Sequence, residues 1–338
     1  MEVKNESGKL CVKCVMPEYK PDITFNAAGQ CSLCSGHKGA NYRRQESPLL
    51  ETELIKMLTR SKKRGRYHCL VMCSGGKDST AALYYMKKRY KLEPLAFTFD
   101  NGFELPDALE NVRNTVERLG VDSLMFKSDF MLDMFAAIVK SRAKAVICHV
   151  CSIWYMGIVL RIAAGLSIPV IIGGWTKGQF SRGRIRHPEF SSMAKGTADF
   201  LERFRRQNPK YRDFPASVEE VIKRAGRQKS ACTVISPHWF LPFDQEEYSG
   251  MIKRELGWKP TALSYPAGST NCRLNFLSVL LSLKHYGYSH YHAEMSRMIR
   301  RGILTREEAL KRLEINFREG DILPVLDRLG CRLDDLYF

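Results

Sequence analysis

Acidic residues and long apolar runs are scarce in this sequence of 338 residues. Thirty-six Asp and Glu stand against 53 Lys and Arg, which leaves a formal net charge of +17. No apolar run approaches the roughly 20 residues that cross a bilayer, and no basic start leads into an apolar stretch. Internal repeats and low-complexity tracts are also missing. We therefore expect a globular, cytoplasmic protein that does not enter a membrane.

Disulfide bridges are a second feature that we do not expect. The chain has 11 cysteines, and thiols stay reduced in the cytosol. Two C-x-x-C pairs lie close together near the start of the sequence, so metal or redox chemistry explains them better than covalent cross-links.

The positive excess gathers in clusters and predicts a partner that carries phosphate. The clusters lie at 61–66, 181–187, 203–212 and 223–229. Each alone is compatible with solvated surface, but together they favour an anionic substrate, either an RNA such as tRNA or a nucleotide. A protein that only binds RNA would satisfy the charge as well, although no platform of aromatic residues for stacking bases stands out.

Apolar strands alternate with helical segments from residue 67 to residue 174. Strands are expected at 67–73, 94–100, 122–127 and 168–174, and helices at 77–90, 105–120, 129–144 and 152–166. This alternation predicts parallel crossover connections and an α/β fold with a doubly wound parallel sheet. Ligands of such sheets bind at the carboxyl ends of the strands.

Three regions follow from these patterns. Residues 1–44 are expected to form a small cysteine-rich knob, and residues 45–243 the nucleotide-binding α/β domain. Within that domain the periodicity is lost over 175–230, which we interpret as a basic insertion or mobile cover. Residues 244–338 read as mainly helical, and Thr305 with Glu308 forms the pattern of a capping box.

The stretch "SGGKDS", which begins at Ser74, follows an apolar strand and opens a helix. Its glycines let backbone amides turn inward, the helix N-terminus adds partial positive charge, and Lys77 adds a full charge. Ser79 and Thr80 add hydroxyl donors. The loop differs from G-x-x-x-x-G-K-[ST], because its glycines are adjacent and Asp78 follows the lysine. It predicts a cradle for pyrophosphate.

This stretch resembles the SGGxDS signature of the PP-loop ATP pyrophosphatases, and the resemblance extends over roughly residues 65–175. It implies an adenine nucleotide alpha hydrolase-like fold and an AMP-forming enzyme that cleaves ATP between the α and β phosphates. The pyrophosphate would be held by Ser74, Gly75, Gly76, Lys77, Asp78 and Ser79, with Asp78 helping to place Mg²⁺. At the ends of the second and fourth strands, ribose and adenine would meet Asp100, Gly173 and Gly174.

Four cysteines near the start of the chain have the spacing of a structural zinc site. The pairs "CVKC" and "CSLC" place Cys11, Cys14, Cys31 and Cys34 in the pattern C-x2-C-x16-C-x2-C. Four thiolates in two such pairs suit tetrahedral Zn²⁺. We predict a zinc-ribbon-like knob, with an iron-sulfur cluster or redox pairs as the alternatives.

A second C-x-x-C, formed by Cys148 and Cys151 in "CHVC", follows the third strand and its helix, and Cys272 lies far downstream. This order is similar to that of PP-loop tRNA thiolases, in which three such cysteines hold a [4Fe-4S] cluster. The resemblance implies that one iron is left open for hydrosulfide beside an adenylated carbonyl. A persulfide carrier with a resolving thiol would use the same pair without iron.

The two ends of the chain resemble a different group. "CVKCVMPEYKPDITFNAAGQCSLC", "ELGWK" and "RGILTREEAL" look like N-acetyl sugar amidotransferases and ExsB-like proteins. That resemblance implies that a carboxylate on a nucleotide sugar is converted into an amide, for surface polysaccharide synthesis. Its ammonia would come from a separate glutaminase, since nothing in the chain reads as one.

We therefore predict an ATP-dependent sulfurtransferase, with amide transfer as the alternative. AMP would activate a carbonyl oxygen on a nucleobase-like substrate, and sulfur would replace that oxygen. The catalytic residues would be Lys77, Asp78, Cys148, Cys151 and Cys272, and a cysteine desulfurase is the expected class of sulfur donor.

Overall fold

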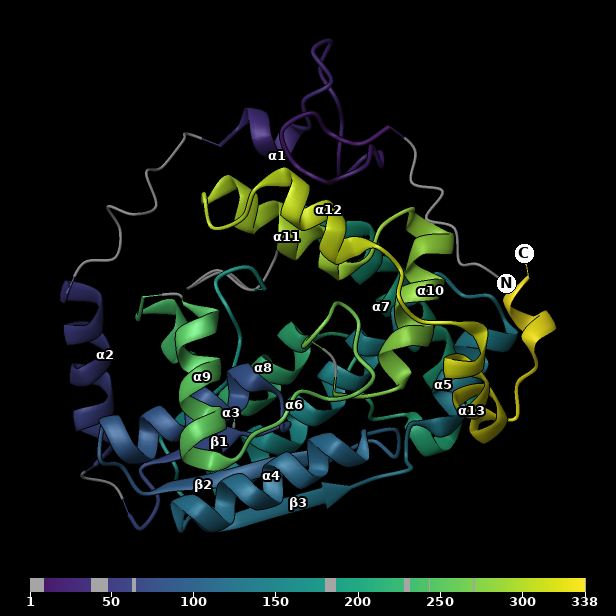
Figure 1. The fold of residues 1–338 in the computed structure, drawn as a ribbon. Helices are drawn as coiled ribbons and strands as arrows, with labels where there is room; N and C mark the ends of the chain where they lie inside the picture. Colours follow the sequence, from purple (N-terminus) through teal and green to yellow (C-terminus); the bar gives the residue numbers. More distant parts are fainter. Residues whose placement is uncertain are drawn as a thin grey trace.

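A computed structural model describes residues 9–37, 48–62, 65–179, 187–227, 232–242, 244–269 and 271–337. Figure 1 shows a parallel sheet covered by helices, with the cysteine-rich segment at one end of the molecule. Most of the basic cluster at 181–187 and parts of the clusters at 61–66 and 223–229 lie outside the described residues.

The sheet has five parallel strands in the order β3-β2-β1-β4-β5. Their bounds are β1 Cys69–Met72, β2 Pro94–Asp100, β3 Ser123–Lys127, β4 Val170–Ile172 and β5 Thr233–Ile235. The first four confirm the predicted doubly wound α/β sheet, and β5 is an addition that the sequence did not reveal. Because the chain order reverses between β1 and β4, a ligand is expected at the carboxyl ends of these two strands, a position that we call the crevice.

Each face of the sheet is covered by its own apolar core. Along β1, Leu70 packs into one core while Cys69 and Val71 pack into the other, as the alternation of side chains in a strand requires. One core is shared with α2 Pro48–Ser61, α3 Lys77–Tyr84, α4 Pro106–Leu119 and α9 Gln245–Leu256. The other is shared with α5 Leu132–Lys140, α6 Ile147–Gly165, α10 Leu274–Tyr286 and α13 Glu319–Leu329.

The helical predictions differ from the structure in two places. The segment that begins with "CHVC" belongs to α6, so Cys148 and Cys151 lie in the first two turns of a helix. Within 175–230, where no periodicity was recognised, α7 Ser191–Gln207 and α8 Val218–Arg227 form. The buried side chains of α7 recur at helical spacing, namely Met193, Thr197, Phe200, Leu201 and Phe204. Basic residues between them concealed this pattern.

The segment from residue 244 onward is mainly helical, as predicted. It contains α9, α10, α11 His290–Arg300, α12 Arg306–Leu313 and α13. The Thr305 side chain accepts a hydrogen bond from the backbone of Glu308, and the Glu308 carboxylate accepts one from the Thr305 backbone at 2.7 Å. This confirms the predicted capping box at the start of α12.

Helix α6 corrects the expectation that no apolar run approaches the length needed to cross a membrane. Its 19 residues are long and apolar enough, by length and composition alone, to cross a membrane. In the fold it is a core helix, because Val150, Ile153 and Val159 are buried against the sheet and the neighbouring helices.

A buried ion pair ties α11 to the short turn Pro188–Phe190 that precedes α7, and a hydrogen bond from the same arginine reaches the loop that follows β4. The guanidinium of Arg297 lies 2.9 Å from the carboxylate of Glu189, and their side chains are 6% and 4% exposed. The same guanidinium donates a hydrogen bond to the carbonyl of Gly178 at 2.9 Å. These contacts hold the carboxyl edge of the sheet against the C-terminal helices.

We expect the substitution Arg297→Ala to lower the free energy of unfolding by about 3 kcal/mol, because it removes the closer of the two cations beside the buried Glu189 carboxylate and leaves only Arg300, at 3.9 Å. Urea unfolding followed by circular dichroism measures the change. The matched control is Lys195→Ala, which breaks the exposed pair with Asp199 and should cost less than about 1 kcal/mol. Equal, small effects of the two substitutions would contradict this assignment.

Candidate active site at the carboxyl ends of the strands

The phosphate loop joins β1 to α3, and its shape requires glycine at residue 75. Gly75 has φ of +78°, and a Cβ there would lie 2.0 Å from the carbonyl oxygen of Ala108. The carbonyl of Gly75 accepts hydrogen bonds from the Trp258 indole at 2.8 Å and the Asn111 amide at 3.2 Å. The loop is therefore held from behind by α4 and by the segment after α9, and its open side faces the crevice.

Lys77 and Asp78 begin α3 and form a polar network. The Lys77 ammonium lies 3.2 Å from the Asp78 carboxylate and donates to the carbonyl of Gly268 at 3.0 Å. The other oxygen of Asp78 accepts a hydrogen bond from the Tyr248 hydroxyl, and burial together with this carboxylate raises the pKa of Tyr248. His238 contacts the Asp78 carbonyl at 2.9 Å. The cation is thus positioned at the N-terminus of α3, where an anion would bind.

The hydroxyl groups of the loop face two directions. The Ser74 backbone N–H donates to the Ser79 hydroxyl at 3.1 Å, and the two hydroxyls are also 3.1 Å apart. The amide of Asn271 donates to the Ser74 hydroxyl at 2.9 Å. Thr80, by contrast, is fully buried, and its hydroxyl has no hydrogen-bond partner among the described residues. Ser74 and Ser79 therefore line the loop, whereas Thr80 faces the interior.

The residues predicted to meet ribose and adenine lie at the expected strand ends. The Asp100 carboxylate, at the end of β2, accepts a hydrogen bond from the Gly102 N–H at 2.7 Å. A Cβ on Gly174 would lie 2.6 Å from the backbone nitrogen of Ser79, so glycine there lets the loop after β4 touch the start of α3. Gly173 donates to the carbonyl of Ile235 at 2.9 Å and continues the sheet.

The structure brings Cys151 and Cys272 together through one buried asparagine. The amide nitrogen of Asn101 lies 3.6 Å from the Cys151 sulfur and 3.4 Å from the Cys272 sulfur. The two sulfurs are therefore less than about 7 Å apart. Cys148 precedes Cys151 by one helical turn, and its backbone N–H donates to the Ser278 hydroxyl of α10 at 3.2 Å. We call the space shared by these three partly exposed thiols the cysteine recess.

A carboxyl group lies in the cysteine recess with the thiols. Glu104 pairs with Cys272 in an isolated antiparallel bridge. Burial, followed by the nearby charge of Glu104, raises the pKa of Cys272. Burial likewise raises the pKa of Cys148 to about 11 and that of Cys151 to about 12, and Glu104 adds to both shifts. Burial and the nearby carboxylate therefore disfavour the charged forms of all three thiols in the recess.

The phosphate loop and the cysteine recess meet at two consecutive residues. Asn271 donates its hydrogen bond to Ser74 in the phosphate loop, while Cys272 contacts Asn101 in the recess. Neighbouring Cα atoms in a chain are about 3.8 Å apart. The predicted nucleotide site and the predicted sulfur site are thus parts of one crevice.

Sequence reasoning missed Asn101, Glu104 and Asn271. Asn101 and Glu104 lie in "DNGFE", at the end of β2, and Asn271 directly precedes Cys272. Polar residues that follow a buried strand of a parallel sheet are a usable signal, because ligands bind at that edge. Asn271 carries no such signal, since only the fold brings its loop to Ser74.

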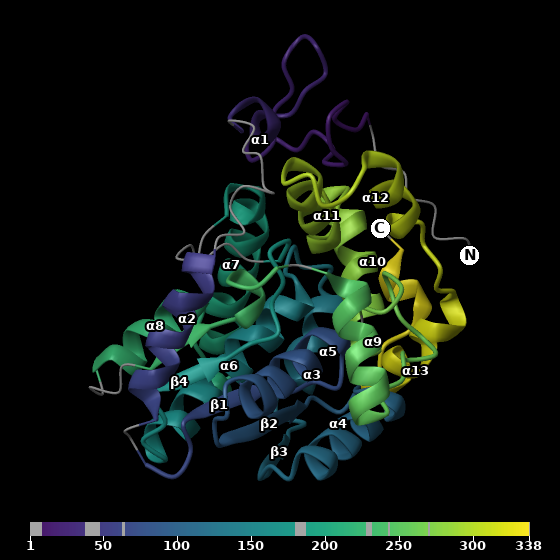
Figure 2. The ribbon, with the colours of Figure 1, turned by 60° about the vertical axis from the view of Figure 1, so that its left-hand side comes forward.

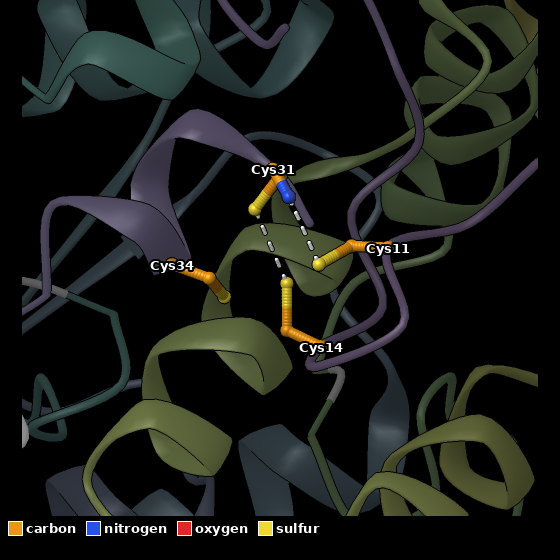
Figure 3. A group of neighbouring side chains, drawn as sticks. All are labelled: Cys11, Cys14, Cys31 and Cys34. Carbon is orange, nitrogen blue, oxygen red and sulfur yellow. Dashed lines mark hydrogen bonds between the residues drawn. The ribbon is translucent and has the colours of Figure 1, made fainter. Parts of the chain in front are cut away.

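The other four predicted metal ligands form a separate, compact cluster (Figure 3). The sulfur atoms of Cys11, Cys14, Cys31 and Cys34 all lie within 4.8 Å of one another. Tetrahedral Zn²⁺ with bonds of 2.3 Å spaces its sulfurs by about 3.8 Å. The Cys31 backbone N–H donates to the Cys11 sulfur at 3.2 Å, and hydrogen bonds with Cys31 and Cys34 lower the pKa of Cys14. These four residues therefore fit a structural zinc ion.

The knob docks on the C-terminal helices, as both ribbon views show (Figure 2). Arg306, at the start of α12, donates to the carbonyls of Cys11 at 3.3 Å and Cys14 at 3.1 Å. The Val15 backbone N–H donates to the Ser296 hydroxyl of α11 at 3.3 Å. The knob thus packs against the same helix whose Arg297 holds the loop after β4.

We expect Cys14→Ser to reduce bound zinc from about one ion per chain to none, because three thiolates and a hydroxyl hold Zn²⁺ poorly. Elemental analysis of the purified protein measures the loss. The half-buried Cys232 lies outside both cysteine sites, so Cys232→Ser is the control and should retain the metal. A wild-type protein that contains no zinc would contradict the assignment.

No protein-family model matches the chain. It is 26% identical over 285 residues to an uncharacterized protein of Methanocaldococcus jannaschii, covering 84% of this chain and 86% of that one. Among solved structures it is similar to the U34-tRNA thiolase NcsA from Methanococcus maripaludis with its [4Fe-4S] cluster, with a TM-score of 0.39 and 17% identity over 90% and 88% of the two chains.

Two other solved structures are similar over about two thirds of the chain. The predicted subunit of a tRNA methyltransferase from Methanocaldococcus jannaschii has a TM-score of 0.33 and 15% identity, over 66% of this chain and 90% of that one. The NH3-dependent NAD synthetase from Campylobacter jejuni has a TM-score of 0.30 and 13% identity, over 67% and 100%.

Proposed function

We propose that this protein is an ATP-dependent sulfurtransferase of the PP-loop type. The carbonyl oxygen of a nucleobase-like acceptor attacks the α-phosphorus of ATP, and pyrophosphate leaves. A sulfur nucleophile then attacks the activated carbon, and AMP departs with the former carbonyl oxygen. The product carries sulfur in place of oxygen.

The adjacency of Asn271 and Cys272 carries this proposal. One side chain contacts the phosphate loop and the next lies among the thiols of the cysteine recess. An acceptor adenylated at the loop would therefore have its reactive carbon close to the three thiols. A protein that only bound a nucleotide would have no need for thiols at this edge of the sheet.

The residues of the phosphate loop have separate roles in the proposed reaction. Lys77 and the backbone amides at the start of α3 would stabilise negative charge that develops on the phosphates. In the structure the ammonium of Lys77 is paired with Asp78. Contact with the pyrophosphate would draw Lys77 away and leave one Asp78 oxygen to help place Mg²⁺.

The donor set of the cysteine recess fits a [4Fe-4S] cluster held by Cys148, Cys151 and Cys272. Within the described part of the chain, their sulfurs do not form a group as compact as that of the zinc knob, so they suit a wider cluster better than a single ion. The charged forms of these three thiols, which burial and Glu104 disfavour, would also be stabilised by a bound cation. When bound, such a cluster supplies an open iron that can hold hydrosulfide.

The acceptor is proposed to be an RNA such as tRNA. Arginines of α7, α8 and the turn between them line an open depression, namely Arg205, Arg206, Arg212 and Arg224. We expect the double substitution Arg206→Ala and Arg212→Ala to weaken tRNA binding and to reduce the slope of log K against log salt by about 1.5. Filter binding at several salt concentrations measures both. The substitution Lys195→Ala on the same helix is the control, and an unchanged slope would exclude this surface.

Anaerobic purification followed by an optical spectrum and by iron, sulfide and zinc analysis tests the function. We expect about four iron and four sulfide per chain beside one zinc, and ATP-dependent thiolation of the acceptor with release of AMP. Thiolation without iron would point instead to a persulfide on the same cysteines. Zinc alone, with ATP-dependent use of ammonia from a glutaminase, would overturn sulfur transfer in favour of amide formation on a nucleotide sugar.

A further inference from the structure

The backbone fixes the Glu104 side chain beside that of Cys272. The Leu105 N–H donates to the carbonyl of Asn271 at 2.8 Å, and the Arg273 N–H donates to the carbonyl of Phe103 at 2.9 Å. These two bonds flank Glu104 and Cys272 and make them a non-hydrogen-bonded antiparallel pair. In such a pair the Cα atoms are about 4.5 Å apart and both side chains leave the same face of the ladder.

The Glu104 carboxyl group lies within electrostatic range of all three thiols of the cysteine recess. Its charge acts on Cys148, Cys151 and Cys272, the only side chains besides Asp100 that the described structure shows interacting with it. Among the described residues, no Lys, Arg or His forms an ion pair with Glu104. A partly buried carboxylate is costly without a cation, so the recess offers one more side chain that can bind a cation than its three cysteines provide.

We propose that Glu104 is a fourth protein ligand of the metal centre in the cysteine recess, binding through a carboxylate oxygen to the iron that the three thiolates leave open. This assignment rests on the proposed function and deepens it. Carboxylate oxygen is a harder and more weakly held ligand for iron than thiolate. Hydrosulfide can therefore replace it, one anion for another, with no change in the oxidation state of the iron. Glu104 would protect the open position between turnovers and leave it when the sulfur substrate arrives.

The stability of the cluster against loss of its fourth iron tests this assignment without any activity measurement. Wild-type protein and the variants Glu104→Gln and Glu104→Cys are purified anaerobically and titrated with ferricyanide. Electron paramagnetic resonance then measures the fraction converted to a three-iron cluster. We expect Glu104→Gln to convert at a several-fold lower dose of oxidant than wild type, and Glu104→Cys to resist conversion. Glu110→Gln, which changes an exposed carboxyl group of α4, is the control and should match wild type.

The outcomes separate this assignment from the function on which it rests. Four irons in the wild type with identical titrations of all three proteins would overturn the role of Glu104 and leave the sulfurtransferase proposal intact. A wild type without iron would overturn both. If Glu104→Gln does not fold, as judged by its zinc content and thermal unfolding, Glu104→Cys decides: resistance supports the assignment, and conversion at the wild-type dose overturns it.

Discussion

ATP-to-pyrophosphate exchange should fall by about 100- to 1,000-fold when Lys77 is replaced by alanine, because one preorganised charge on the phosphates is lost. Lys77 lies in the first turn of α3, where its ammonium contacts Asp78 and the carbonyl of Gly268. These contacts hold the cation at the open side of the phosphate loop before ATP arrives. Exchange of labelled pyrophosphate in the presence of acceptor measures the effect.

The matched control for this experiment is Lys87→Ala, ten residues along the same helical segment. The partly buried side chain of Lys87 pairs with the exposed Glu93 at 2.7 Å, away from the loop. Its removal should leave exchange within about twofold of wild type and cost less than about 1 kcal/mol of stability. Equal losses of exchange in the two variants would mean that the effect of Lys77 is structural, and full exchange by Lys77→Ala would exclude the loop as the ATP site.

Cys272→Ser should abolish the thiolated product while pyrophosphate exchange continues. Cys272 is the thiol that the fold places between Asn101 and Glu104, and a serine hydroxyl is a poor ligand for iron and a poor carrier of sulfur. The phosphate loop is untouched, because Asn271 rather than Cys272 contacts it. Mass spectrometry of the acceptor nucleosides measures thiolation, and exchange of labelled pyrophosphate measures activation. Iron analysis of the variant shows whether the metal centre is lost.

Cys232→Ser is again the control, since Cys232 is half-buried near the edge strand β5 and its thiol contacts the Ile168 carbonyl at 3.2 Å. It should retain iron and full thiolation. Together with Lys77→Ala, this pair of experiments divides the proposed reaction in two. One variant should lose activation and the other should lose sulfur transfer. Thiolation at the wild-type rate by Cys272→Ser would remove this thiol from the mechanism.

The order of elements from β1 to β4 could be predicted because it depends on local chemistry. Strand β2 occupies the same seven residues that its apolar, β-branched and aromatic composition predicted. Helix α4 was predicted to within a residue at each end, since Pro106 suits a first turn and Gly120 adopts the left-handed conformation that ends a helix. The short strand β5 was not predicted, because it has three residues and its pairing with β4 is a long-range contact that so short a segment does not indicate.

The phosphate loop and the cluster of four cysteines could be predicted from the sequence, because each is built by residues that are close in sequence. Spacing alone places two glycines, a lysine and the end of a strand in one turn, and four thiols in two knuckle pairs. The cysteine recess is different. Cys148 and Cys272 are separated by more than 100 residues, and their meeting depends on how α10 packs on α6. Their position after β2 could have marked Asn101 and Glu104 as candidates for this edge of the sheet, but their contacts with the cysteines, like the place of Asn271, follow from the packing of the segment before α10 against the end of β2. Local sequence thus specifies the phosphate loop and the cluster of four cysteines, whereas the cysteine recess arises from long-range packing, whose pairings no short stretch of sequence encodes.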